Sequence, residues 1–123
     1  MRRVLLGFCC LLGLHPLAPL AQPGDQPRPL LESEEFARAK DLYRECVLEK
    51  GVQLLAVNDF DTAMRYAPLV CRRGLLQIKR YMLDSAFKVE VMDGLVASIA
   101  EGVEIDLANR LLEVQQRQAV EGM

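Results

Sequence analysis

The chain has little of the side-chain chemistry that most enzymes use. It contains one histidine, His15, and this residue lies within an N-terminal segment that we expect to be removed. The remaining chain then has no imidazole to serve as a general base or as a metal ligand. Serine and threonine are also scarce, and the whole set is Ser33, Thr62, Ser85 and Ser98. These absences exclude many enzyme classes, and we expect a protein with no catalytic, cofactor-binding or metal-binding residues.

Motifs that would bring such chemistry are missing as well. The sequence holds no glycine-rich phosphate loop, calcium-loop pattern or Asn-x-Ser/Thr sequon. Ser85 and Lys88 match the Ser-x-x-Lys pattern of penicillin-binding proteins and serine β-lactamases, but the accompanying Ser-Asp-Asn and Lys-Thr-Gly elements do not occur. Since Ser85 follows an apolar run that ends at Leu83, we interpret it as a helix cap instead.

No apolar run is long enough to cross a bilayer, and the longest one has a different interpretation. Arg2 and Arg3 precede an apolar stretch of eleven residues, from Val4 to Leu14, whereas a membrane span takes roughly 20. A short basic head before a short apolar core is typical of a cleaved signal peptide. We therefore expect residues 1–21 to be a signal peptide, cut after Ala18 or Ala21, and expect no permanent membrane anchor.

The segment after the predicted signal peptide has the composition of a linker. Residues 22–30 read QPGDQPRPL, with three prolines and no apolar periodicity. We expect a single helical domain over residues 31–123. A domain of this size buries somewhat over ~60% of its unfolded surface, so it has one modest core.

Two of the four cysteines lie in the predicted signal peptide, which leaves Cys46 and Cys71. In an oxidising compartment we expect these two to form a disulfide. The turn signal Asn58-Asp59 lies midway between them, so two helices that fold back there bring both thiols to the same height. A redox or metal-binding pair is disfavoured because there is no Cys-x-x-Cys spacing.

Helices are predicted on both sides of that turn because apolar residues recur there at spacings of three and four. Ser33 is the expected N-cap of the first helix, and Asp59 or Asp61 that of the second. Pro68 is expected to break or kink the second helix near Ala67. The predicted buried stripes are Phe36, Ala39, Tyr43, Cys46, Val47, Lys50, Leu54 and Val57, then Phe60, Met64, Ala67, Cys71, Leu75, Ile78 and Met82.

The C-terminal third is also predicted to be helical. One predicted apolar face consists of Met92, Leu95, Val96, Ile99 and Val103. A second, after Gly102, consists of Ile105, Ala108, Leu111, Leu112, Gln115 and Ala119. No segment alternates between apolar and polar residues as a half-buried strand would. The expected fold is therefore all-α, a small bundle of about four helices built on a disulfide-clamped helical hairpin.

Charge is divided unevenly along the chain. Without the predicted signal peptide, thirteen Lys and Arg face seventeen Asp and Glu, a net charge of −4, which argues against a nucleic-acid partner. Residues 65–88 carry a single acid, Asp84, whereas residues 89–123 carry seven. We call one set of cations the basic ridge and one set of acids the acidic ridge. The basic ridge is Arg65, Arg72, Arg73, Lys79 and Arg80, and the acidic ridge is Asp41, Glu45 and Glu49.

Two interpretations of the ridges follow. The favoured one is that they face each other or are simply solvated, since surface ion pairs contribute only ~0–1 kcal/mol each. The functional one is that the basic ridge is a candidate surface for binding a protein partner.

These observations favour an exported protein, in the bacterial periplasm or, alternatively, secreted from a eukaryotic cell. We expect it to bind another protein without catalysis, as an immunity protein or a small periplasmic chaperone does. The alternative is a structural or accessory subunit that acts by self-association, for example as a homodimer, or within a larger envelope complex. No cofactor is expected.

Overall fold

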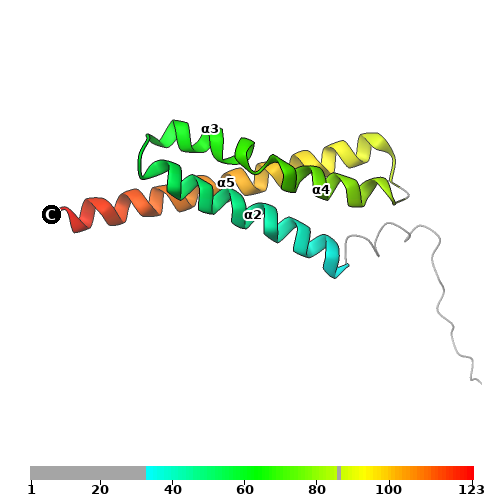
Figure 1. Ribbon diagram of the computed structural model, residues 1–123, viewed down its shortest axis with the longest axis horizontal. Coiled ribbons are helices and arrows are strands. Elements are labelled where there is room, and N and C mark those ends of the chain that lie inside the picture. Colours follow the sequence, from blue (N-terminus) through cyan, green and yellow to red (C-terminus); the bar gives the residue numbers. More distant parts are fainter. Residues whose placement is uncertain (1–32, 86) are drawn as a thin grey trace, which may run out of the picture.

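The structure, a computed structural model, describes residues 33–85 and 87–123. The predicted signal peptide and linker lie outside the described residues. Within these ranges the chain forms four helices and no strand, as Figure 1 shows: α2 Glu34–Leu55, α3 Phe60–Val70, α4 Arg72–Leu83 and α5 Val89–Glu121. The predicted all-α fold class is confirmed.

The helices form an elongated bundle. α3 and α4 follow each other along one side, α2 folds back against both of them, and α5 runs the length of the molecule (Figure 1). The C-terminal end of α5 projects beyond the other helices (Figure 1). Across the described ranges, none of the helices has the apolar length that a bilayer crossing requires.

Local polar signals set the ends of the first two helices as expected. The Ser33 hydroxyl accepts a hydrogen bond from the Phe36 amide at 3.1 Å, and the Asp59 carboxylate accepts one from the Thr62 amide at 2.7 Å. Both N-caps are thus confirmed, because each satisfies an amide that has no partner inside its helix.

The break in the second predicted helix lies at Cys71, four residues beyond Ala67, where Pro68 led us to expect it. α3 continues through Pro68 to Val70, and Cys71, with φ −94° and ψ 11°, separates α3 from α4. The proline lacks only its own amide, whereas the Cys71 amide still donates to the Ala67 carbonyl at 3.2 Å. The helix therefore completes one more turn before it ends.

Two expectations for the C-terminal half are wrong. Gly102 does not separate two helices, because α5 is continuous from Val89 to Glu121. One glycine costs a helix only about 1 kcal/mol, and buried residues beyond it keep the helix in place. Ser85 is not an N-cap either. Its hydroxyl donates to the Met82 carbonyl at the end of α4, and Lys88 occupies the N-cap position of α5.

The disulfide is present where it was predicted. Cys46 on α2 is bonded to Cys71 at the junction of α3 and α4, with their Cα atoms 5.9 Å apart. It closes a loop that contains the whole α2–α3 turn, so it ties the two arms of the hairpin together near the middle of the bundle.

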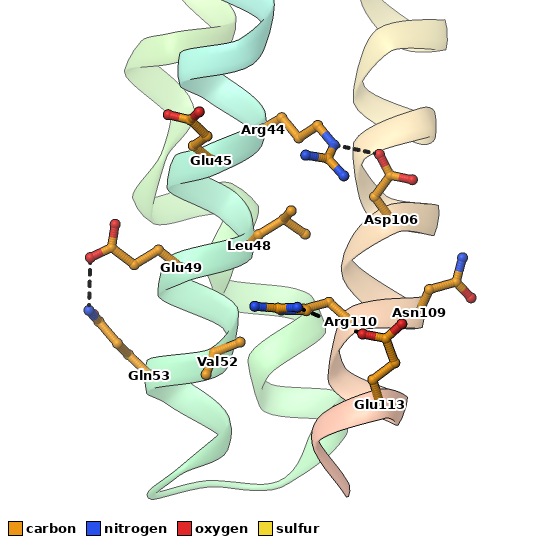
Figure 2. Close-up of a pocket in the computed structure, with 10 residues that line it drawn as sticks. All are labelled: Arg44, Glu45, Leu48, Glu49, Val52, Gln53, Asp106, Asn109, Arg110 and Glu113. Carbon is orange, nitrogen blue, oxygen red and sulfur yellow. Dashed lines mark hydrogen bonds and ion pairs between the residues drawn. The ribbon is translucent and has the colours of Figure 1, made fainter. Parts of the chain in front are cut away.

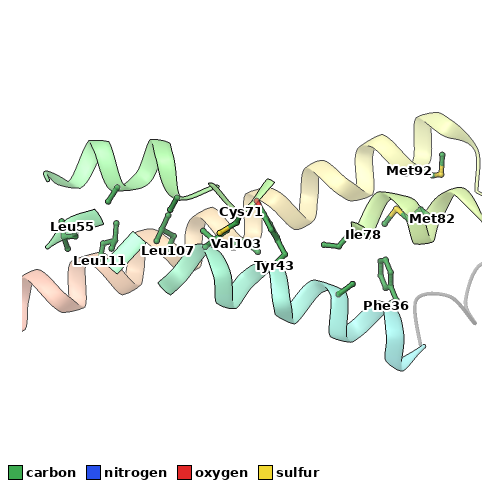
Figure 3. Close-up of a cluster of buried hydrophobic side chains, with 14 residues drawn as sticks. Phe36, Tyr43, Leu55, Cys71, Ile78, Met82, Met92, Val103, Leu107 and Leu111 are labelled. Carbon is green, nitrogen blue, oxygen red and sulfur yellow. The ribbon is translucent and has the colours of Figure 1, made fainter. Parts of the chain in front are cut away.

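A single core runs along the inside of the bundle. Figure 3 shows its side chains between the helices, and the largest fully buried ones are Phe36, Tyr43, Val47, Ile78, Met82, Leu107 and Leu111. The predicted stripe of the first helix is correct up to Val47, but the buried line continues through Gly51 and Leu55, while Val57 is exposed. Glycine gave no apolar signal, so the half-buried Lys50 was assigned to the stripe in its place.

Two glycines let the helices approach closely. A Cβ on Gly51 would overlap Cδ1 of Leu107, so α5 packs directly on the backbone of α2. A Cβ on Gly74 would lie 3.1 Å from Cβ and 3.2 Å from Cα of Tyr43, which is tight but not an overlap, so α4 also packs closely on α2. At both positions a larger residue would make a neighbouring side chain or helix shift.

Candidate interaction surfaces

No part of the described chain has the arrangement of a metal or redox site. Within residues 33–85 and 87–123, no three His, Cys, Asp or Glu side chains are grouped to hold a metal ion, and no cysteine is free. Burial raises the pKa of the Tyr43 hydroxyl, and the nearby Glu104 raises it further. Because Tyr43 is enclosed in the core, this shift reflects packing rather than a reactive group.

The basic ridge lies on two helices. Arg65 is on α3, and the other four residues are on α4, so the seven-residue spacing between Arg65 and Arg72 crosses the non-helical Cys71. We call the outward side of α4 the α4 outer face. It consists of Arg72, Arg73, Leu76, Lys79, Arg80 and Leu83.

Leucines lie among the cations of the α4 outer face. Leu76 is 54% exposed and Leu83 is 61% exposed. Residues three and four apart in a helix are neighbours on its surface, so Leu76 has two arginines one turn before it and two cations one turn after it. A shallow hollow of about 270 Å³ lies there, lined by Arg73, Leu76, Gln77 and Arg80.

Ion pairs among the described residues use few of these charges. Three pairs are formed by the described residues: Arg44 with Asp106 at 2.8 Å, Lys79 with Asp93 at 3.2 Å, and Arg110 with Glu113 at 3.7 Å. None of the three joins the acidic ridge to the basic ridge. Apart from Lys79, the cations of the α4 outer face are exposed and have no carboxylate within ion-pair distance among the described residues.

A groove between α2 and α5 is a second feature, and the predicted acidic ridge lies along its α2 side. Figure 2 shows its widest part, a hollow of about 700 Å³ with apolar Leu48 and Val52 on its α2 side. The Arg44–Asp106 pair crosses it from one helix to the other (Figure 2). Glu45 of the acidic ridge lines the same hollow.

The groove continues toward the N-terminal half of α5. A second hollow of about 450 Å³ shares Arg44 and Asp106 with the first, and Ser98, Gly102 and Ile105 line its α5 side. Arg44 and Asp106 are 62 positions apart in the sequence, so no local pattern indicated that they line one groove.

Two surfaces thus stand out, the α4 outer face and the α2–α5 groove with the side of α5 that borders it. The predicted basic ridge contributes four of its five residues to the first. The three residues of the predicted acidic ridge, Asp41, Glu45 and Glu49, all line the second. Comparison with protein-family models, with curated proteins and with solved structures finds no match for this chain.

Proposed function

We propose that the protein binds another protein, without catalysing a reaction, through the α4 outer face. The observation that carries this proposal is the pair of exposed leucines surrounded by arginines that have no acidic partner among the described residues. Protein interfaces commonly have an apolar centre with arginine at the contact, and arginine is enriched among the residues that contribute most to binding.

The geometry defines the kind of partner. Leu76 offers an apolar contact, and Arg73 and Arg80, one turn to either side, are placed to donate to carboxylates around it. The matching surface is an apolar pocket or helix face with acidic residues at its rim. Opposite charge on the two surfaces also accelerates association and makes the rate sensitive to salt.

We infer that this binding takes place outside the cytoplasm. The Cys46–Cys71 disulfide supports an oxidising compartment, because such bonds persist in the periplasm and in secretions and are rare in reducing cytosol. The bacterial periplasm is the preferred location. A stable helical scaffold with one charged contact face suits an immunity protein or a small chaperone, both of which act by binding alone.

A structural or accessory role is the second candidate function, and one observation favours it. Ile105 and Leu112, both on the side of α5 away from the core, are 56% and 51% exposed. Apolar side chains in such positions are explained if the protein is a subunit of an assembly.

The test compares two charge reversals of equal size. The Arg73→Glu/Arg80→Glu variant should lose partner capture from an exported-protein extract by about tenfold or more, because two favourable contacts become repulsive. The Arg38→Glu/Arg117→Glu variant changes net charge equally at two exposed sites, on α2 and α5, that are not part of the α4 outer face, and it should capture as the wild type does. Equal capture by both variants would contradict the proposal.

A further inference from the structure

The outward side of α5 carries a continuous line of uncharged residues. α5 has 33 residues, nine of them charged, yet none of the nine lies on this line. Its members alternate in spacing between four and three, the pattern of a helix that packs along another helix. We call this line the α5 seam. It is Val91, Leu95, Ser98, Gly102, Ile105, Asn109, Leu112, Gln116 and Ala119.

Nothing within the described chain covers most of the seam. Leu95 is partly buried, whereas Val91, Ile105 and Leu112 are 46%, 56% and 51% exposed. The core residues of α5, such as Leu107, lie on its opposite side. The helix also continues from residue 115 to 121 with every residue exposed, and Figure 1 shows this end beyond the bundle.

Gly102 has no role in packing this chain. A Cβ at this position would meet nothing within 4 Å, unlike one at Gly51 or Gly74. A glycine inside a helix costs about 1 kcal/mol relative to alanine. The cost is unexplained within one copy, but a glycine on a seam allows a second helix to approach closely.

We propose that the occupant of the seam is a second copy of this chain, with the two α5 helices antiparallel and crossing near Gly102 and Ile105. A two-fold interface requires one surface to match itself, and this seam does. When Gly102 of one copy lies opposite Ile105 of the other, the smallest residue faces a bulky one. Leu95 then faces Leu112, and Ser98 faces Asn109, so that the central part of the seam pairs apolar with apolar and polar with polar. At the ends of the seam, Val91 faces Gln116 and Ala119 lies level with Lys88.

Charge beside the seam selects the antiparallel arrangement. In that register Glu101 lies opposite Ala108 of the second copy, and Asp106 lies opposite Ile99, so no like charges face each other across the flanks. In a parallel pair, Glu101 would lie beside Asp106 of the second copy, and symmetry would repeat the repulsion. Like charges at such flanking positions disfavour pairing.

The contact is also long enough for a stable dimer. From Val91 to Ala119 the seam extends about 42 Å at 1.5 Å per residue. With its flanking positions it offers roughly eighteen residues per copy, close to the ~20–30 on each side of a standard interface. The hollow beside Ser98, Gly102 and Ile105 lets the second helix contact α2 as well.

The principal test is the mass of the purified chain in solution, measured by light scattering over a range of concentrations. We expect twice the denatured mass at high concentration and a shift to monomer on dilution. Gly102→Glu should weaken dimerisation by at least about a hundredfold, because it buries a carboxylate opposite Ile105. A monomer at every concentration would overturn the proposal.

Gly94→Glu is the matched control. Gly94 lies on the same helix, and a Cβ there also meets nothing within 4 Å, but it flanks the seam, so that a side chain there would lie at the solvent-exposed rim of the contact, beside Gln115 of the second copy. Both substitutions should leave the helical circular dichroism of the monomer intact. Equal loss of the dimer in both variants would contradict the seam as the contact.

Orientation is tested with pyrene attached to the C-terminus. In the antiparallel dimer, the C-terminal ends of the two α5 helices are about 50 Å apart, so no excimer emission is expected. A parallel dimer would bring the two pyrenes together, and excimer emission would therefore overturn the antiparallel arrangement. This proposal does not depend on the α4 outer face. The Arg73→Glu/Arg80→Glu variant should remain dimeric but lose its partner. The Gly102→Glu variant should become monomeric but still bind the partner.

Discussion

The helices contain four glycines, Gly51, Gly74, Gly94 and Gly102, which fall into two pairs, and the contrast between the pairs separates two regions of the molecule. Gly51 and Gly74 lie inside the bundle, where an added Cβ would press on Leu107 or Tyr43. Gly94 and Gly102 lie on the outer part of α5, where an added Cβ would meet nothing. The inner pair is explained by the fold of one chain, and the outer pair is not.

The same contrast holds for apolar side chains. Inside the bundle they are buried and determine how firmly the chain folds. On the α4 outer face and the α5 seam they are exposed, so removing them costs the monomer little. The inner region should therefore govern stability and the outer surfaces should govern binding, and substitutions in the two regions should have separable effects.

Leu107→Ala and Leu112→Ala test this separation with one substitution in each region. Leu107 is fully buried, so its truncation should cost about 2–5 kcal/mol of unfolding free energy. Leu112 is 51% exposed, and its truncation should cost the monomer less than about 1 kcal/mol. Urea denaturation at a concentration where the chain is monomeric measures both. Equal losses would remove the distinction between the regions.

The disulfide should account for the next largest share of inner stability. Cys46→Ala/Cys71→Ala releases a loop with a sequence separation of 25 residues. On the chain-entropy model the loss is about 3.5 kcal/mol. Thermal unfolding of this variant should match that of the reduced wild-type protein. If reduction leaves the unfolding midpoint unchanged, the disulfide does not clamp the hairpin.

Replacing single glycines by alanine tests the same contrast, with expected changes in unfolding free energy of about 1 kcal/mol. Gly94→Ala should raise the free energy of unfolding by about 0.5–1 kcal/mol, since alanine is the better helix former and the site is open. Gly74→Ala should give no such gain, because its Cβ would lie 3.2 Å from the Cα of Tyr43. A gain at Gly74 as large as at Gly94 would show that the α2–α4 contact is not tight.

The smallest predicted effect lies at the α2–α3 turn. Hydrogen bonds from Thr62, with help from Arg65, hold the pKa of Asp59 below its ordinary value of 3.8. A carboxylate with a lowered pKa in the folded state stabilises the fold above its unfolded pKa, and the effect is lost as the pH falls through the folded pKa. The melting temperature of Asp59→Ala should therefore lie below that of the wild type at neutral pH, and the gap should narrow below about pH 4. A gap that widened on acidification would contradict this assignment.

The sequence predicted correctly those features that are specified by local signals. The caps at Ser33 and Asp59 and the turn between α2 and α3 depend on residues that are close in sequence. The disulfide was predictable because its two cysteines lie at equal distances from that turn. The end of α3 was misplaced because a proline removes only its own amide. The break at Gly102 was wrong because packing on α2 outweighs the cost of one glycine.

The surfaces were harder to predict for a different reason. Apolar periodicity marks a face without saying whether this chain or another covers it, so Ile105 and Leu112 were assigned to the same face as the buried Leu111. The Arg44–Asp106 pair joins residues 62 apart, and no spacing rule predicts it. The basic ridge was found because its repeat lies almost entirely within one helix.

Amide hydrogen exchange at two protein concentrations tests most directly whether the outer surface of α5 is an interface. In the monomer, residues 115–121 are exposed on every side, so their amides should exchange fast. At a concentration that favours the dimer, we expect slower exchange in this segment and in the seam around Gly102, and unchanged exchange in the core of α2. Identical exchange at both concentrations would contradict it.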